Sequence, residues 1–194
     1  MDAFFIYLRL GFEHITDLGG YDHMLFLLAL CAAYPWREIR RLFWLLTAFT
    51  LGHAITLAIS TARGPILPSD WVEFLIPVTI LATCIGNIAM KGESLSSNAM
   101  RLRYVLAAMF GLIHGMGFSN YLRGLLLDHG DLFQPLLAFN IGLEAGQLLV
   151  VAVVAGIIAL LVRWTPISAY WIRILVSIAA ALVAVWMSWQ NLPL

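Results

Sequence analysis

The sequence predicts an all-α, polytopic membrane protein with about six transmembrane helices and an N-terminal amphipathic or re-entrant segment. Of the 194 residues, 62% are hydrophobic and 11% are charged, and the mean hydropathy is +0.90. This composition is much more apolar than that of a soluble domain. Several apolar stretches separated by short charged breaks approach the roughly 20 residues that a helix needs to cross a bilayer.

The predicted spans are residues 21–34, 42–62, 71–90, 102–122, 133–162 and 170–189. The first span is short, so we expect the apolar segment at residues 4–12 to lend it length. The fifth is long, so we expect it to tilt or to break near Gly142. We detect no internal repeat and no soluble segment, and therefore expect a single transmembrane domain over residues 1–194.

Basic residues predict the orientation, because short positively charged loops tend to stay in the cytoplasm. The breaks after the first, third and fifth spans carry Arg37, Arg40, Arg41, Lys91, Arg101, Arg103, Arg163 and Arg173. The alternate breaks carry Arg63 and Arg123, with Asp70, Asp128 and Asp131 nearby. We therefore expect both termini outside, in the inner membrane of a bacterium. The start of the chain lacks a basic n-region and a cleavage pattern, so we expect it to be retained.

Other features limit the partners. Cys31 and Cys84 fall within predicted spans, where a free thiol behaves as a small apolar side chain, so no disulfide framework is predicted. No basic face is wide enough to indicate a nucleic acid, and no nucleotide-binding motif is present. We expect membrane lipid around the chain, and the sequence does not predict an oligomeric state.

Polar residues gather in the outer half of the predicted bundle. With a rise of about 1.5 Å per residue, His23, His53 and His114 fall in the outer halves of three spans. Asn140, Glu144 and Gln147 share one stripe of the fifth span at i, i+4 and i+7 spacing. Ionisable groups in a membrane normally turn inward and find partners. We therefore predict that these side chains meet in one pocket beneath the outer surface.

The residue types in this group indicate a metal site. Neutral imidazole binds nickel, cobalt, copper and zinc, and a carboxylate adds negative charge or orients a ligating ring. The predicted ligands are His14, Asp22, His23, His53, His114 and Glu144, with Glu73, Asn140 and Gln147 in support.

Each of these residues also has a purely structural interpretation. His53 could hydrogen-bond a neighbouring helix, and Asp22 could stabilise a helix N-terminus. The glycines around His114 favour close helix packing. Glu73, beside Trp71, fits an interfacial carboxylate.

Four motifs together resemble the HupE/UreJ family of hydrogenase and urease accessory membrane proteins. They are HITDLGGYDH at residues 14–23, GHAITL at 52–57, GLIHGMGF at 111–118 and FNIGLEAGQ at 139–147. The resemblance implies a six-helix permease for divalent nickel, and also cobalt. Its transport residues would fall on His14, Asp22, His23, His114 and Glu144. The chain departs from the family pattern in the length of ITDLGGY, which is two residues longer, and in Ala54, where a serine is expected.

Three functions fit a His and carboxylate site. The first is a permease whose substrate is nickel or cobalt, driven by an ion gradient, the membrane potential or proton exchange. The alternative is an intramembrane zinc-dependent hydrolase, because three histidines with an open position and a carboxylate also describe catalytic zinc. His-Glu-x-x-His and Gly-x-Ser-x-Gly motifs are absent from the sequence. The third is a metal sensor or scaffold, which would bind metal without flux or turnover.

Overall fold

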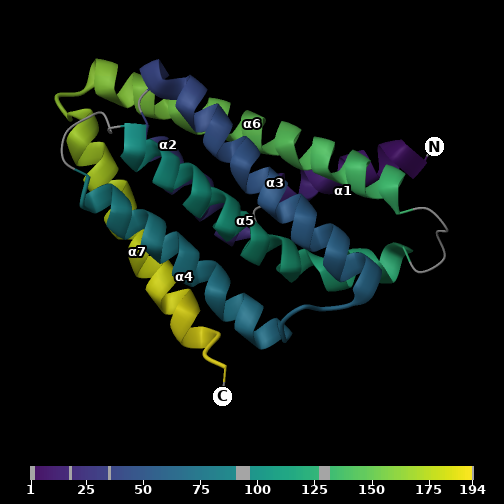
Figure 1. Ribbon diagram of the computed structural model, residues 1–194. Helices are drawn as coiled ribbons and strands as arrows, with labels where there is room; N and C mark the ends of the chain where they lie inside the picture. Colours follow the sequence, from purple (N-terminus) through teal and green to yellow (C-terminus); the bar gives the residue numbers. More distant parts are fainter. Residues whose placement is uncertain (1–2, 18, 35, 91–96, 127–131, 194) are drawn as a thin grey trace.

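The computed structural model describes residues 3–17, 19–34, 36–90, 97–126 and 132–193. These residues form helices and no strand (Figure 1), which confirms the predicted all-α polytopic fold. The helices are α1 (Ala3–Thr16), α2 (Tyr21–Ala33), the 3-10 helix η1 (Trp36–Glu38), α3 (Ile39–Arg63), α4 (Ser69–Ile88), α5 (Ser97–Leu126), α6 (Phe133–Trp164) and α7 (Ala169–Gln190). The last five are long and apolar enough to cross a membrane, and α2 is a shorter apolar helix.

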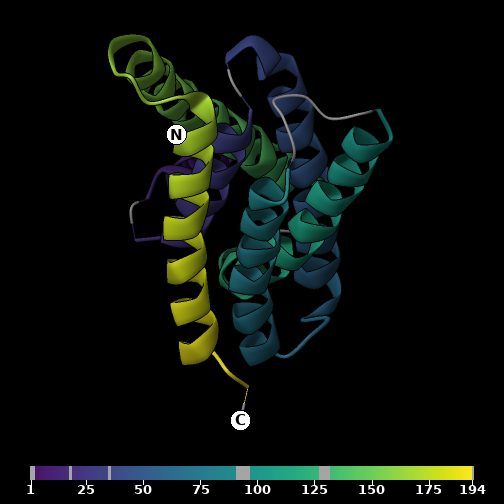
Figure 2. The ribbon, with the colours of Figure 1, turned by 90° about the vertical axis from the view of Figure 1, so that its left-hand side faces the viewer.

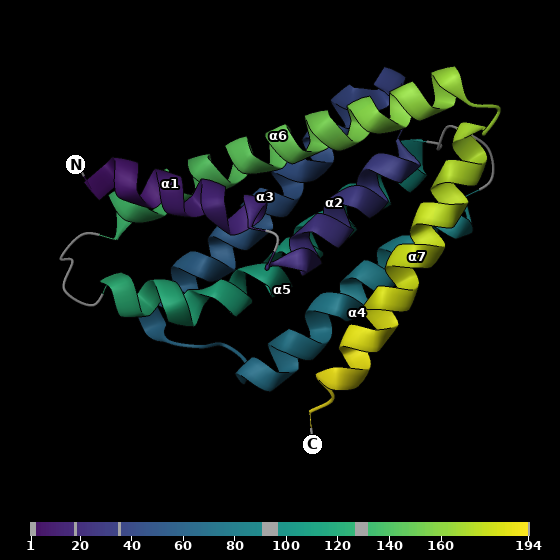
Figure 3. The same cartoon turned by 180° about the vertical axis from the view of Figure 1, so that it is seen from behind.

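The first predicted span is preceded by a separate helix, so that α1 and α2 follow one another along the bundle (Figure 3). The chain turns after α1, where Asp17 Oδ1 accepts a hydrogen bond of 2.9 Å from the Gly19 backbone N–H. The Gly20 N–H donates to the Asp17 carbonyl at 3.1 Å. Asp22 lies in the first turn of α2, where its carboxylate interacts favourably with the helix dipole. The N-terminal segment therefore supplies length, as the sequence predicts.

Of the two alternatives for the long fifth span, a tilt or a break near Gly142, the break is wrong, because α6 is one continuous helix from Phe133 to Trp164. Gly142 instead lets α1 approach closely. A Cβ atom there would overlap the carbonyl oxygen of Leu8, and a Cβ at Gly11 would overlap that of Phe139. Later residues of α1 contact later residues of α6, so the two helices run parallel.

The helices α3 and α5 form a second parallel pair with the same kind of contact. A Cβ at Gly52 would overlap the carbonyl oxygen of Ala108, and a Cβ at Gly111 would overlap that of Phe49. Small residues at such crossings allow backbone-to-backbone packing, on which helix association in a membrane depends.

The helices α4 and α7 lie side by side and antiparallel (Figure 2). At one end, an Arg173 guanidinium N–H donates to the Met90 carbonyl at 2.9 Å. At the other, the Asn191 amide donates to the Glu73 carbonyl at 3.4 Å. Pro77 has no N–H to offer that carbonyl within the helix, so the Asn191 contact supplies a donor. The short helix α2 packs against α4, α6 and α7.

The bundle has two sides with different charge. The start of α1 and the end of α7 lie on the side that we call the terminal side (Figure 1). We call the opposite side, where α3, α5 and α7 begin, the basic side, because its described arginines are Arg37, Arg40, Arg41, Arg101, Arg103, Arg163 and Arg173. Lys91, Asp128 and Asp131 lie outside the described residues. At the terminal end of α3, Gly64 adopts a φ of 99°, which favours glycine.

Candidate metal centre

Four histidines from four helices converge inside the bundle. His14 comes from α1, His23 from α2, His53 from α3 and His114 from α5. The ring centroids of His14 and His23 are 4.8 Å apart, and those of His23 and His114 are 5.3 Å apart. His53 lies 6.3 Å from His14 by the same measure. These histidines are far apart in the sequence, and the structure brings them together as predicted.

The geometry of three of these imidazoles is close to that of a metal site. One nitrogen each from His14, His23 and His53 lies within 4.8 Å of the other two. Nitrogens that share one ion in a tetrahedral site, with bonds of about 2.0–2.1 Å, lie about 3.4 Å apart. The three rings therefore have to move closer together to bind one ion.

The ring nitrogens in the cluster are short of partners. Among the described protein atoms, no hydrogen-bond partner is found for Nε2 of His14, His23 or His114, or for either nitrogen of His53. His53 is fully buried and His114 is only 1% exposed. An unsatisfied polar atom in an apolar interior is costly. Coordination to a cation would satisfy several of these nitrogens at once.

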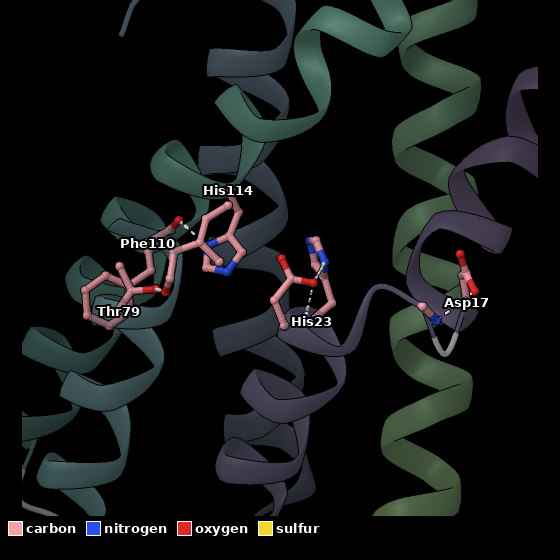
Figure 4. Close-up of polar contacts among 8 residues, drawn as sticks. Asp17, His23, Thr79, Phe110 and His114 are labelled. Carbon is pink, nitrogen blue, oxygen red and sulfur yellow. Dashed lines mark hydrogen bonds and ion pairs between the residues drawn. The ribbon is translucent and has the colours of Figure 1, made fainter. Parts of the chain in front are cut away.

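Two hydrogen bonds orient the rings (Figure 4). Nδ1 of His23 lies 3.1 Å from Asp22 Oδ1, and the carbonyl of Phe110 accepts a 2.8 Å bond from His114 Nδ1. Because Nδ1 carries the proton in both contacts, Nε2 of each ring keeps its lone pair for a ligand. Asp22 also accepts from the His23 backbone N–H at 2.9 Å, which holds the carboxylate in place. Asp22 thus stands where an orienting carboxylate would be needed.

We predict that Asp22→Asn weakens metal binding about 10–100-fold, which is the usual loss when the orienting partner of a metal-bound histidine is removed. An amide can still fill the space but supplies no negative charge. Titration calorimetry of the purified protein with nickel measures the change. Asp17→Asn is the matched control, because Asp17 bonds the turn at Gly19 rather than a ring. Equal affinities for Asp22→Asn and the unmodified chain would contradict the orienting role.

Phenylalanine rings surround the histidines. The Phe118 and His14 ring centroids are 4.1 Å apart, and Phe139 stacks on His53 at 6.3 Å. Phe49 lies 5.0 Å from His114, with Phe26 at 5.8 Å from the same ring. This apolar shell keeps water away and strengthens electrostatic interactions inside it. Sequence reasoning did not select these residues, although Phe118 and Phe139 lie within two of the histidine and carboxylate motifs.

The carboxylate and amides of α6 form a separate polar contact. The Thr47 hydroxyl donates to Glu144 at 2.9 Å, and the Thr50 hydroxyl donates to Gln147 at the same distance. Thr47 precedes His53 by six residues, which places it about 9 Å nearer to the basic side. The set of close ligand atoms among the described residues does not include Glu144. The amide of Asn140 donates to the Leu136 carbonyl of its own helix at 2.7 Å.

Glu73 does not join the histidines. It is exposed near the start of α4 and lines a different small pocket with Gly117 and Asn120. Its position agrees with the interfacial carboxylate that the sequence allowed as the alternative.

A cavity lies beside the cluster and extends toward the end of α5, because Tyr121 is among its lining residues. It has a volume of about 520 Å³, and its lining includes Leu10, Glu13, His14, Asp17 and Phe118. His14 therefore belongs both to the cavity and to the histidine cluster. Carboxylates at such an entrance raise the local concentration of cations.

Comparison with known proteins agrees with the motifs. No curated protein and no solved structure matches the chain. The family described as HupE / UreJ protein matches residues 1–191. With nearly the whole chain covered, the protein belongs to the HupE/UreJ family, a family of membrane proteins associated with nickel and cobalt transport.

Proposed function

We propose that this protein is a permease for a divalent transition metal, nickel or cobalt, and that the histidine cluster is its binding site. The observation that carries the proposal is the convergence of four histidines whose Nε2 atoms have no hydrogen-bond partner among the described residues. If the cluster bound no metal, these buried nitrogens would lack a partner, which is unfavourable. Family membership supports the choice of transport.

The proposed entry route begins at the cavity on the terminal side. A hydrated cation is attracted by Asp17, which lines the cavity together with Glu13, a carboxylate that is paired with Arg9. At His14 it exchanges water for imidazole nitrogen, and His23 and His53 complete the set of close ligands. Neutral imidazoles suit nickel and, unlike a set of thiolates, add no negative charge that would hold the cation, which allows the ion to leave again.

The orientation is part of the proposal. The arginines of the basic side favour a cytoplasmic location for that side, because positively charged loops tend to stay in the cytoplasm. The terminal side, with the cavity and both ends of the chain, then faces outward. We infer an inner membrane of a bacterium, so that the metal passes from the outside to the cytoplasm.

Flux into liposomes tests the proposal. Purified protein is reconstituted, and entry of nickel, cobalt and zinc is followed with a trapped metal-sensitive dye under an inward gradient. We expect nickel or cobalt entry that is lost in His114→Ala and retained in Glu73→Gln, because Glu73 is exposed and apart from the cluster. Protein-free liposomes give the background. Tight retention of one metal per chain with no flux would contradict the permease and favour a resident metal.

A further inference from the structure

The two parallel helix pairs have the same internal geometry. In the α1 and α6 pair, Gly142 lies against the carbonyl of Leu8, three residues before Gly11, and Gly11 lies against the carbonyl of Phe139, three residues before Gly142. The contact is therefore reciprocal. Each glycine lies against the carbonyl that is three residues before the glycine of the opposite helix.

The α3 and α5 pair repeats this relation without change. Gly111 lies against the carbonyl of Phe49, three residues before Gly52, and Gly52 lies against the carbonyl of Ala108, three residues before Gly111. The surrounding sequences also correspond. Both α1 and α5 contain Gly-x-x-His, as GFEH and GLIH, whereas α3 and α6 contain Phe-x-x-Gly, as FTLG and FNIG.

These matched helices run in opposite directions. α1 runs away from the terminal side and α5 runs toward it, as their course in Figures 1 and 3 shows. Since α6 is parallel to α1 and α3 is parallel to α5, the matched helices α3 and α6 are also opposed. A rotation by half a turn about an axis across the bundle would therefore place the α3 and α5 pair on the α6 and α1 pair.

The third pair, α4 and α7, obeys the same rotation. A Pro-Ile pair and then a serine and a tryptophan precede or begin both helices, as PILPSDW and PISAYW. Counted from these tryptophans, the buried positions coincide, as in Val72 and Ile172, Ile80 and Ala180, and Cys84 and Ala184. The end contacts are reciprocal too, because the start of α7 bonds the end of α4 and the end of α7 bonds the start of α4.

We propose that the chain is an inverted repeat, in which α1, α3 and α4 correspond to α5, α6 and α7 about an axis in the membrane plane. Transporters built this way bind their substrate at the interface between the repeats and expose it alternately to the two sides. His14 and His114 occupy equivalent positions, so the histidine cluster lies between the two halves. The helix α2, with Asp22 and His23, has no counterpart among the described residues.

A second cavity provides an exit for the metal, and this step rests on the proposed permease function. Leu10 lines the cavity on the terminal side, and its equivalent, Phe110, lines a cavity of about 260 Å³ beneath His114. The second cavity reaches Arg103 of the basic side. The two cavities share the one equivalent position of Leu10 and Phe110, and their other lining residues do not correspond.

Arg103 closes this exit in the present conformation. Its guanidinium donates to the Tyr34 hydroxyl at 3.3 Å, to Asn87 Oδ1 at 3.2 Å and to the Gly86 carbonyl at 3.1 Å, which ties α5 to α2 and α4. A fixed positive charge also repels a departing cation. The equivalent residue of α1 is Ala3, whose side chain cannot form such hydrogen bonds. We infer that the structure is the conformation closed on the basic side.

Labelling of single cysteines tests the inverted repeat and the exit. Cys31→Ala and Cys84→Ala provide a background without thiols, into which Leu10→Cys or Phe110→Cys is introduced. A charged, membrane-impermeant thiol reagent is then applied to right-side-out and inside-out vesicles. We expect Leu10→Cys to react from the terminal side and Phe110→Cys from the basic side. Met109→Cys, at a neighbouring position of α5 that is 52% exposed toward the membrane, should react from neither.

Arg103→Ala should increase the labelling rate of Phe110→Cys about tenfold or more, because hydrogen bonds of a charged group hold the exit closed. Arg101→Ala, an exposed arginine of the same helix, should not change it. Leu106→Cys lines the same cavity and replaces Phe110→Cys if that variant does not fold. No basic-side labelling at either position, even with Arg103→Ala, would overturn the repeat and its exit. Labelling as expected without metal flux would instead leave the repeat standing and overturn the permease.

Discussion

Replacing His53 with alanine should lower the affinity for nickel by at least about 100-fold, which exceeds the usual loss when only the hydrogen-bond partner of a ligand is removed. His53 is fully buried, and both of its ring nitrogens lack a hydrogen-bond partner among the described residues. It is also one of the three histidines with close ligand atoms. Of the three close ligands, only His14 and His23 would remain, and they would leave the ion more hydrated, which is unfavourable inside a phenylalanine shell.

The measurement is titration calorimetry in detergent, with metal retention after gel filtration as a second readout. Phe49→Leu is the matched control, because Phe49 lies one turn before His53 on α3 and contacts the same rings but carries no ligand. Its affinity should stay within a few-fold of the unmodified chain, and thermal melting should show that both variants are folded. Nickel binding by His53→Ala as tight as that of the unmodified chain would remove His53 from the site.

Gly142→Ala should destabilise the protein by about 3 kcal/mol or more, at the upper end of what overpacking a core usually costs. The added methyl group would overlap the Leu8 carbonyl oxygen, which belongs to the backbone and cannot move by a side-chain rotation. The helices α1 and α6 would have to separate. Because α1 carries His14, metal affinity should fall with stability.

Gly156→Ala is the control within the same helix. A Cβ atom at Gly156 meets nothing within 4 Å, so the change should leave the melting temperature unchanged or raise it slightly, as alanine favours helix. The comparison is made by thermal melting in detergent. Equal melting temperatures for the two variants would contradict the close crossing of α1 and α6.

The predicted spans correspond to α2 through α7, because lipid requires every segment that crosses it to be a sufficiently long, apolar helix. Length and apolarity can be read from each segment of the sequence by itself. The break predicted at Gly142 is wrong for the opposite reason. A glycine inside a helix can mark a kink or a close neighbour, and only the presence of α1 against α6 decides between them.

The candidate site was predicted in part. His23, His53 and His114 could be placed at a common depth from helix direction and rise, and the structure brings them together with His14. Glu73 shares that depth but lies in another pocket, because depth does not fix the direction in which a helix face points. Glu144 pairs with Thr47 across α3 and α6, a contact that no local pattern reveals.

The repeat that we propose was not detected in the sequence. The residues that match are few, α2 interrupts the first half, and α6 is longer than α3. Corresponding side chains differ in size and polarity, as Cys84 and Ala184 do, since each half packs against different neighbours. Reciprocal glycine contacts reveal the relation because backbone distances depend on helix geometry rather than on side-chain identity.

By itself, the sequence determined that this chain is a helical membrane protein of the HupE/UreJ type and which residue types could bind a metal. These properties follow from local composition, helix length and short motifs. The tertiary structure alone decided which polar groups share a site, which helices run in contact and where the cavities lie. Such features depend on the rotation and pairing of helices, which are fixed by contacts between residues distant in the chain.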